Sequence, residues 1–119
     1  MNKYKRDAIK NYFPLPNEIF SLGLSSGEIS VYSYLMFCED RKTFQCYPSY
    51  KNIGKAVKMS ANTVRKYVAE LENKHLIITE PTKVHTRSGE VRNGSLLYTI
   101  LPIQQAVDYF HGEQLSKYA

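Results

Sequence analysis

The sequence predicts a mainly α domain of the α+β class, in which three helices, a short β-hairpin and a closing helix share one core. Three observations support this prediction. Residues 48–78 hold two short helical patterns separated by a tight break, and residues 25–38 hold a wider one. Two strand patterns with a basic turn between them follow over residues 76–100. The chain of 119 residues is long enough for one modest core.

The first helix of the central pair is predicted to begin after Ser49, whose side chain can cap it. Its apolar residues Ile53, Ala56 and Val57 follow the i, i+3, i+4 spacing of one buried face. Lys58 and Met59 form the break. We expect Met59 to fill the corner between the two helices.

The second helix is predicted over residues 61–73, with Ser60 as its N-cap. Its apolar stripe consists of Val64, Tyr67, Val68 and Leu71. The opposite face carries an amide, a hydroxyl, a guanidinium and an ammonium group, on Asn62, Thr63, Arg65 and Lys66, and no acid comes before Glu70. Such groups reach base edges and phosphates in a major groove. The plainer alternative is a solvated face, but the lack of acids favours DNA recognition.

At this point the residues resemble the winged helix-turn-helix domains of bacteria. The match is the arrangement Ser-x-x-x-Ile-Gly-x-x-Val-x-Met-Ser-x-x-Thr-Val-x-x-Tyr-Val-x-x-Leu-x-x-x-x-Leu-Ile, which starts at Ser49. The lead-in over residues 41–49 resembles a subgroup of replication-initiator-like and regulator proteins of Gram-positive plasmids and mobile elements. The resemblance covers residues 15–101. Many members have Gly where this chain has Lys58 and His75, and a non-Gly residue adopts φ > 0 at a cost, so both corners can be built differently here.

The charge of the chain favours a polyanionic partner. The net charge is +5, from 16 Lys and Arg against 11 Asp and Glu. Residues 51–92 account for all of it. Hydrophobic and charged contents of 43% and 23% are ordinary for a globular protein.

Metal binding, membrane insertion and catalysis find no support in the sequence. Cys38 and Cys46 do not combine with the distant His75, His85 and His111 into a zinc spacing, so buried, reduced thiols are the better interpretation. No signal peptide and no apolar run near 18 residues is present. No nucleophile–base pair, phosphate loop or carboxylate pair stands at a telling spacing, so we expect no enzyme and no cofactor. His75 fits a role at the end of the second helix better than one in acid–base chemistry.

The N-terminal region predicts an arm and then the first core helix. Residues 1–13 are basic and aromatic; they suit an arm that reaches DNA or a partner, or a frayed end with a short helix around 7–12. Asn17 can cap one helical turn over 18–22, which Gly23 would stop. Ser25 and Glu28 fit a capping box for a helix that runs to about residue 38. The apolar stripe of that helix is Ile29, Tyr32, Leu35 and Met36. A short strand is expected over 44–47.

The C-terminal region predicts a wing and a closing helix. Strands over 76–79 and 95–100 flank a hairpin that turns at Ser88-Gly89. Its cations can follow phosphates or enter the minor groove, although surface hairpins are often basic by chance. These are Lys83, Arg87 and Arg92, with His85. Pro102 can open a helix with Ile103, Ala106, Val107 and Phe110 on one face, stopped at Gly112, that covers the core or forms a dimer seam.

The sequence thus predicts an arm (1–16), a winged helix-turn-helix domain (17–101) and a C-terminal helix (102–119). The expected function is sequence-specific binding of double-stranded DNA in the bacterial cytoplasm, as a transcriptional regulator or a replication-initiator-type domain. The helix over 61–73 would enter the major groove, with Asn62 and Arg65 reading bases. Phosphates would be held by Ser60, Thr63, Lys66, Lys51, Lys55 and the wing residues Lys83, Arg87 and Arg92. A homodimer, and a protein-interaction module with only non-specific DNA affinity, stay open. The chain leaves no room for a small-molecule effector domain.

Overall fold

The computed structural model describes residues 3–6 and 10–118. The chain begins with a 3-10 turn, η1 (Asn17–Ser21). Three helices and one short strand follow: α1 (Ser26–Cys38), β1 (Gln45–Cys46), α2 (Tyr50–Val57) and α3 (Ala61–Asn73). The remaining elements are β2 (Ile77–Glu80), β3 (Lys83–His85), β4 (Val91–Asn93), β5 (Leu97–Ile100) and α4 (Ile103–Ser116).

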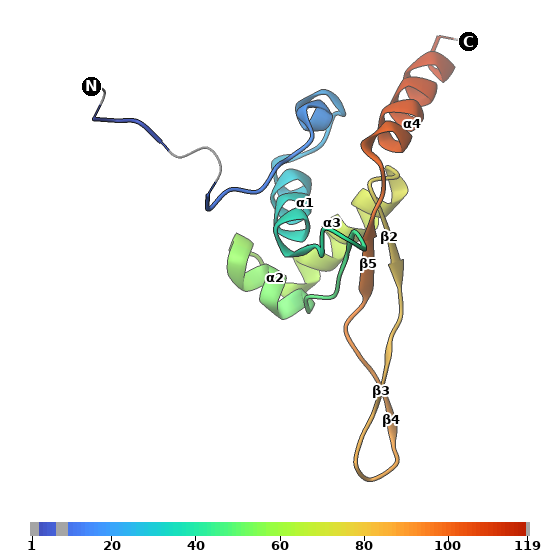
Figure 1. The fold of residues 1–119 in the computed structure, drawn as a ribbon. Helices are drawn as coiled ribbons and strands as arrows, with labels where there is room; N and C mark the ends of the chain where they lie inside the picture. Colours follow the sequence, from blue (N-terminus) through green and yellow to red (C-terminus); the bar gives the residue numbers. More distant parts are fainter. Residues whose placement is uncertain (1–2, 7–9, 119) are drawn as a thin grey trace.

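These elements form a winged helix-turn-helix fold, as predicted. Helices α1, α2 and α3 pack together beside a three-stranded antiparallel sheet of order β1-β5-β2. The separate hairpin β3–β4 continues from β2 and β5 as a long wing that projects away from the helices, and α4 leaves the opposite end of the sheet (Figure 1). The wing therefore stands free of the core, next to α2 and α3.

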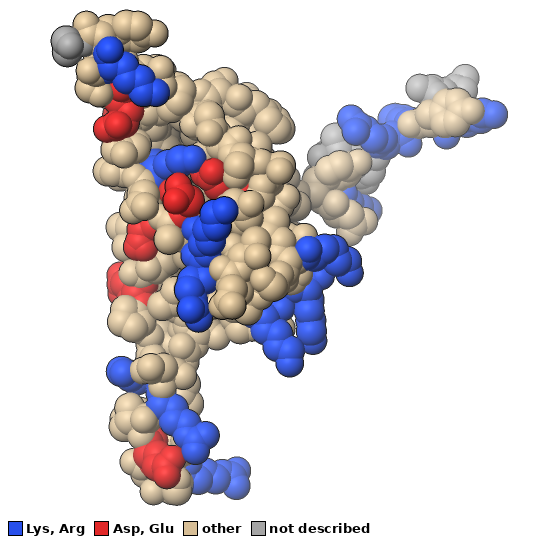
Figure 2. Space-filling view, turned by 180° about the vertical axis from the view of Figure 1, so that it is seen from behind, with Lys and Arg blue, Asp and Glu red and all other residues tan. Residues whose placement is uncertain are grey.

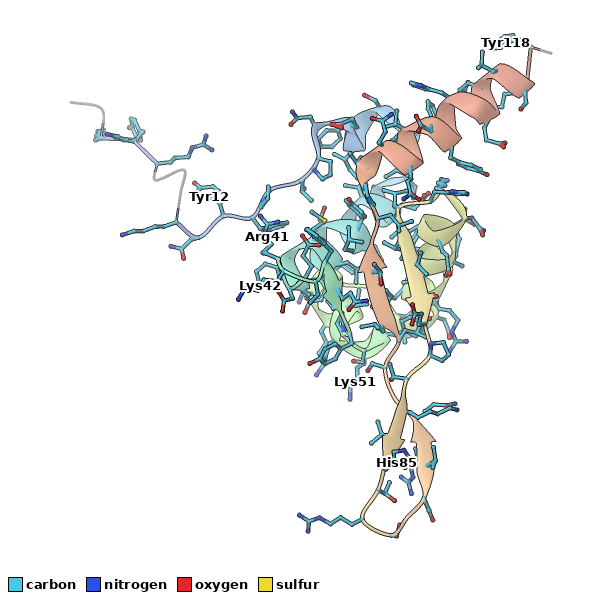
Figure 3. The ribbon with its side chains drawn as sticks, turned by 45° about the vertical axis from the view of Figure 1, so that its right-hand side comes forward. Tyr12, Arg41, Lys42, Lys51, His85 and Tyr118 are labelled. Atoms are coloured by element: carbon cyan, nitrogen blue, oxygen red, sulfur yellow. The ribbon has the colours of Figure 1, made fainter. Side chains whose placement is uncertain are left out.

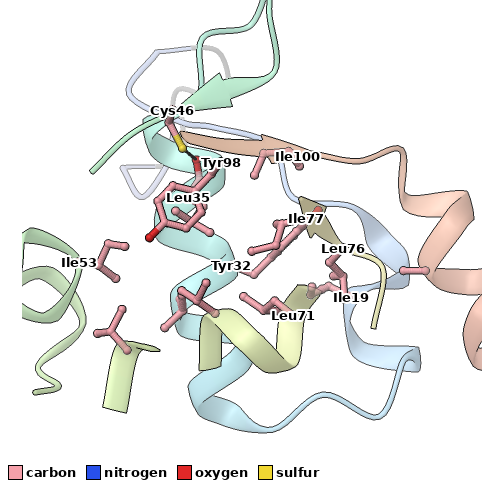
Figure 4. Close-up of a cluster of buried hydrophobic side chains, with 14 of the residues drawn as sticks. Ile19, Tyr32, Leu35, Cys46, Ile53, Leu71, Leu76, Ile77, Tyr98 and Ile100 are labelled. Carbon is pink, nitrogen blue, oxygen red and sulfur yellow. Dashed lines mark hydrogen bonds between the residues drawn. The ribbon is translucent and has the colours of Figure 1, made fainter. Parts of the chain in front are cut away.

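The core lies where the helices meet the sheet (Figure 4). The predicted stripe of α3 is confirmed, because Val64, Val68 and Leu71 are at most 3% exposed. In α1, Tyr32 and Leu35 are buried and the rest of the stripe is half-buried. The core is completed by Ile19, Leu22, Val31, Cys46, Ile53, Leu76, Ile77, Tyr98, Ile100 and Ala106.

The prediction that Ala56 faces the core is wrong. Ala56 is exposed, and the buried residues of α2 are Ile53 and Gly54. A Cβ atom at Gly54 would collide with the carbonyl oxygen of Met59 in the turn after α2. The glycine thus lets the turn backbone approach the helix closely, which the apolar periodicity of the sequence does not reveal.

Three of the four predicted N-caps are confirmed. Ser25 and Glu28 form the complete capping box of α1, while Ser49 and Ser60 accept hydrogen bonds from the N–H groups of Asn52 and Thr63. The prediction for Asn17 is wrong: Asn17 lies inside η1, after Pro16, and no side chain caps that turn. A 3-10 turn of five residues starts here from the fixed φ of a proline instead.

The turns after α2 and α3 have the left-handed backbone conformation that usually requires glycine, although Lys58 and His75 occupy these positions. Lys58 has φ 61° and His75 has φ 66°, so the expectation of a different construction is wrong. After α3, the N–H of His75 bonds to the carbonyl of Glu72 and the N–H of Leu76 bonds to that of Leu71. This is a Schellman motif, whose hydrogen bonds hold His75 in the left-handed region.

Helix α4 does not stop at Gly112 as predicted; it continues to Ser116. One glycine inside a helix costs about 1 kcal/mol and does not end it without a competing turn. Ala106 is buried, and Ile103, Val107 and Phe110 pack against the core. At the other end of the chain, residues 10–12 are not helical, and residues 7–9 of the helix expected around 7–12 lie outside the described residues.

Candidate nucleic-acid interface

The outer face of α3 presents the four polar side chains that were predicted for it. Asn62, Arg65 and Lys66 are exposed, and Thr63 is half-buried. The Ser60 hydroxyl lies 2.9 Å from the Thr63 hydroxyl and also caps the helix. These two hydroxyls are therefore partly used within the protein, whereas no hydrogen bond or ion pair among the described residues engages the side chain of Asn62.

The two cations of this face lie over tyrosine rings instead of beside acids. The guanidinium carbon of Arg65 is 5.7 Å from the centroid of the Tyr50 ring, and Lys66 Nζ is 5.3 Å from that of Tyr67. Within the described part of the chain, the three ion pairs involve other cations: Arg41, Lys74 and Arg92. The positive charge of α3 is thus available to an external anion.

Helix α2 adds two exposed cations, Lys51 and Lys55, and Lys58 is exposed in the turn after it. Figure 2 shows basic side chains gathered over the helical body beside the wing and along the wing itself, while acids lie mainly along the left edge and in the centre of this view, and also in the wing. Lys51 and His85 lie toward this end of the molecule, far from Tyr118 at the end of α4 (Figure 3). Helix α2, the outer face of α3 and the wing therefore form one predominantly basic side.

The wing cations do not all share one face. Directly paired residues of an antiparallel hairpin lie on the same face, and faces alternate along each strand. Lys83 pairs with Asn93, and Val84 pairs with Arg92. Lys83 and Arg92 consequently point to opposite faces, and Arg87 lies in the exposed tip between the strands.

Two wing cations already have partners. Lys83 Nζ donates to Asn93 Oδ1 at 2.6 Å, and Arg92 lies 3.1 Å from Glu90 Oε2. Both groups are solvent-exposed, so these contacts are weak and can exchange for a phosphate. Arg87 has no such partner within the described residues.

Sequence reasoning missed two residues of this region. Tyr50 was treated only as the first residue of a helix, but its ring supports Arg65. Lys74 was counted in the basic segment, but its Nζ lies 2.6 Å from Glu28 Oε2, whose side chain is 6% exposed. The contact of Tyr50 with Arg65 and the pairing of Lys74 with Glu28, 46 residues away, are tertiary contacts. No local sequence pattern predicts them.

The thiols and histidines do not form a second site. Cys46 is buried, and burial raises the pKa of its thiol to about 12. Cys38 is half-buried, and both cysteines are free thiols. In the described ranges no three His, Cys, Asp or Glu side chains come together as metal ligands would. None of the described helices is long and apolar enough to cross a bilayer.

A family model matches the part of the chain that contains α2 and α3. Residues 22–77 match the model of a family described as a helix-turn-helix domain. The match runs from the residues before α1 to the first residue of β2, and so includes α2, α3 and the turn between them. Comparison with curated proteins gives no match.

Several solved structures resemble the chain. One is described as a possible transcriptional regulator from Methanosarcina mazei Go1, with 17% identity, 83% of this chain and 74% of that chain covered, and a TM-score of 0.54. Another is the C30S mutant of Lactococcus lactis ZitR in complex with DNA, with 18% identity, 98% and 68% covered, and a TM-score of 0.41. At these identities the first likeness shows the fold alone, and the second adds nothing to it.

Proposed function

We propose that this chain binds double-stranded DNA sequence-specifically, with α3 in the major groove and the wing along the adjacent backbone. The observation that supports this most is the outer face of α3, where Asn62, Arg65 and Lys66 are exposed without a neighbouring acid. Asn suits adenine and Arg suits guanine through paired hydrogen bonds, each worth about 1–3 kcal/mol of discrimination. Ser60, Thr63, Lys66, Lys51 and Lys55, together with the wing residues Lys83, Arg87 and Arg92, then hold phosphates.

The test is a binding selection on a randomised duplex library, followed by affinities for the selected duplex and a scrambled one over a salt series. Specific recognition predicts a preference of about a thousandfold or more for the selected duplex. Arg65→Ala should relax the preference at one base pair by about 1–3 kcal/mol. Lys55→Ala should weaken both duplexes alike and lower the salt slope by about 1. Equal affinity of the unmodified protein for both duplexes, vanishing as salt rises, would reject the proposal.

Two biological roles fit this activity in the bacterial cytoplasm. One is transcriptional regulation, and the other is DNA binding by a replication initiator of a mobile element. A regulator binds near promoters, and an initiator binds repeated sites at an origin. The location of the selected sequence in the source genome therefore distinguishes them.

A homodimer is compatible with the shape of α4. Its second half extends beyond the body (Figure 1) and exposes Leu115 (72%), and Tyr118, two residues after the helix ends, is 87% exposed. If two copies pair through these residues, the selected site should be an inverted repeat with half-sites about 10 bp apart, or a multiple of that. Sedimentation of Leu115→Asp beside the unmodified chain tests this pairing, and a monomeric unmodified protein rejects it.

A protein-interaction module is the second candidate, because several large apolar side chains are exposed. Among them, Phe20 is 79%, Phe37 62% and Tyr47 72% exposed. Exposed apolar side chains mark an interaction surface where they form a contiguous patch. This candidate predicts only salt-sensitive DNA binding without sequence preference, together with a stable protein partner, so the binding selection decides between the two.

A further inference from the structure

Tyr50 lies where the three proposed DNA-binding elements meet. It is the first residue of α2, directly after the N-cap Ser49, and its half-buried ring packs against the core. On its other side it lines an open groove of about 550 Å³ with Val84 and Gly94 at the base of the wing. A ring held by a helix start and the core has little freedom to move, so it can serve as a fixed platform.

The group on this platform is the guanidinium of Arg65, which is 5.7 Å from the ring centroid. A cation over an aromatic face is attracted by the electron-rich ring without using its N–H donors. Arg92 shows the contrast, because its Nε and Nη2 groups both donate to Glu90 Oε2. Arg65 is thus restrained in direction while its donors stay available, which is what paired hydrogen bonding to guanine requires.

We propose that Tyr50 is a positioning residue that sets DNA sequence specificity by orienting Arg65 before DNA binds. This inference rests on the proposed function of α3. A free arginine side chain must lose rotamer freedom when it binds, and a stacked one has already lost part of it. Tyr50 need not touch the base that Arg65 reads. Its effect should appear at that base pair alone, since it acts through one side chain.

The experiment is a double-mutant cycle of four proteins (the unmodified chain, Tyr50→Leu, Arg65→Ala and the double variant) with two control variants. Leu keeps an apolar side chain for the core and removes the ring. Tyr50→Phe retains the ring face, and Tyr12→Leu makes the same exchange at an exposed tyrosine distant from Lys51 and the wing (Figure 3). Affinities are measured for the selected duplex, its variants at each base pair and the scrambled duplex. In the DNA-free proteins, NMR measures the ring-current shift of the Arg65 side-chain protons.

Tyr50→Leu should weaken binding to the selected duplex by about two- to fivefold, the range expected for an exposed cation–π contact. The loss should fall at the base pair that Arg65→Ala affects, and Tyr50→Phe should restore binding. In the Arg65→Ala background, Tyr50→Leu should have no further effect. The upfield shift of the Arg65 protons should be present in the unmodified protein, Tyr50→Phe and Tyr12→Leu, and absent in Tyr50→Leu.

Three outcomes would overturn the inference while leaving the proposed function intact. One is an equal loss on both duplexes, which would mean that Tyr50 acts through the fold or a phosphate. Another is an undiminished effect of Tyr50→Leu without Arg65. The third is an unmodified protein whose Arg65 protons show no ring-current shift. An unmodified protein that prefers no duplex would reject the proposed function itself, and the inference with it.

Discussion

Replacing Lys74 with Met should destabilise the fold by about 2 kcal/mol, because it breaks a partly buried ion pair between α1 and the residue that ends α3. Lys74 Nζ lies 2.6 Å from Glu28 Oε2, and the other oxygen of Glu28 accepts from the N–H of Ser25 in the capping box. Removing one partner of a buried pair costs about 3–5 kcal/mol. The Lys74 side chain is 30% exposed, so water can partly replace its ammonium group, and the Ser25 bond remains. These two facts lower our value to about 2 kcal/mol.

Urea and thermal unfolding at pH 7, followed by circular dichroism, measure this loss. For a domain of this size, 2 kcal/mol corresponds to a decrease in Tm of about 6–10 °C. Lys42→Met is the matched control, because Lys42 is exposed and lies outside the ion pairs of the described residues; its stability should stay within about 0.5 kcal/mol of the unmodified protein. If Lys74→Met is as stable as Lys42→Met, then the ion pair does not hold α1 to α3 and the reasoning is refuted.

The pH dependence gives an independent check on the same pair. Burial alone would raise the pKa of Glu28, but the hydrogen bonds from Lys74 and Ser25 outweigh it, so the pKa is lowered from 4.5. A lowered folded-state pKa means that the ionised Glu28 stabilises the fold above pH 4.5, and that this contribution is lost as the pH falls through the folded-state value. The difference in stability between the unmodified protein and Lys74→Met should therefore shrink below pH 4.5. A constant difference down to pH 2.5 would contradict the assignment.

Three further predictions concern single positions. Gly54→Ala should destabilise the fold by about 1–3 kcal/mol in urea unfolding, since the new methyl group meets the Met59 carbonyl; an unchanged midpoint would contradict the close approach. Lys58→Gly should stabilise the fold by about 0.5–1 kcal/mol, because glycine adopts the φ of 61° without a steric cost. This value already subtracts the larger conformational entropy that glycine loses on folding. A loss of stability would show that Lys58 is not strained in this turn. Cys46, with its pKa raised to about 12, should react with iodoacetamide at pH 8 far more slowly in the folded protein than in urea, as mass spectrometry of the alkylated peptides can show.

The helices of the central pair could be predicted from sequence because their signals are local. Ser60 and the stripe of Val64, Val68 and Leu71 lie within twelve consecutive residues and define both the start of α3 and its buried face. The failures arose where the outcome depends on residues further along the chain. Ala56 matched the apolar spacing, yet the turn after α2 needs its closest approach at Gly54. Gly112 matched a helix stop, but nothing after it offers the backbone a better set of hydrogen bonds than the helix.

The candidate interface was predictable in part, because exposure on α3 follows from the periodicity that also defines its core face. The sequence does not show which cations are free of an acidic partner within the protein. Lys74 and Arg92 count equally with Arg65 in a net charge, yet one is held by buried Glu28 and the other lies against Glu90. The Lys74–Glu28 pair joins residues 46 positions apart and depends on the tertiary fold, so a count of charges overstates the basic surface.

The strand pairing of the wing is also a tertiary feature, and it restricts how the wing can bind DNA. The register of the hairpin puts Lys83 and Arg92 on opposite faces, so a wing that lies flat on one backbone brings only one of them to a phosphate. A wing that enters the minor groove edge-on brings one to each wall. Arg87, in the exposed tip, would be within reach of DNA in both arrangements. The hairpin register thus determines which of Lys83 and Arg92 can reach a phosphate in each docking mode of the wing. Neither the composition nor the alternation of the sequence gives this register.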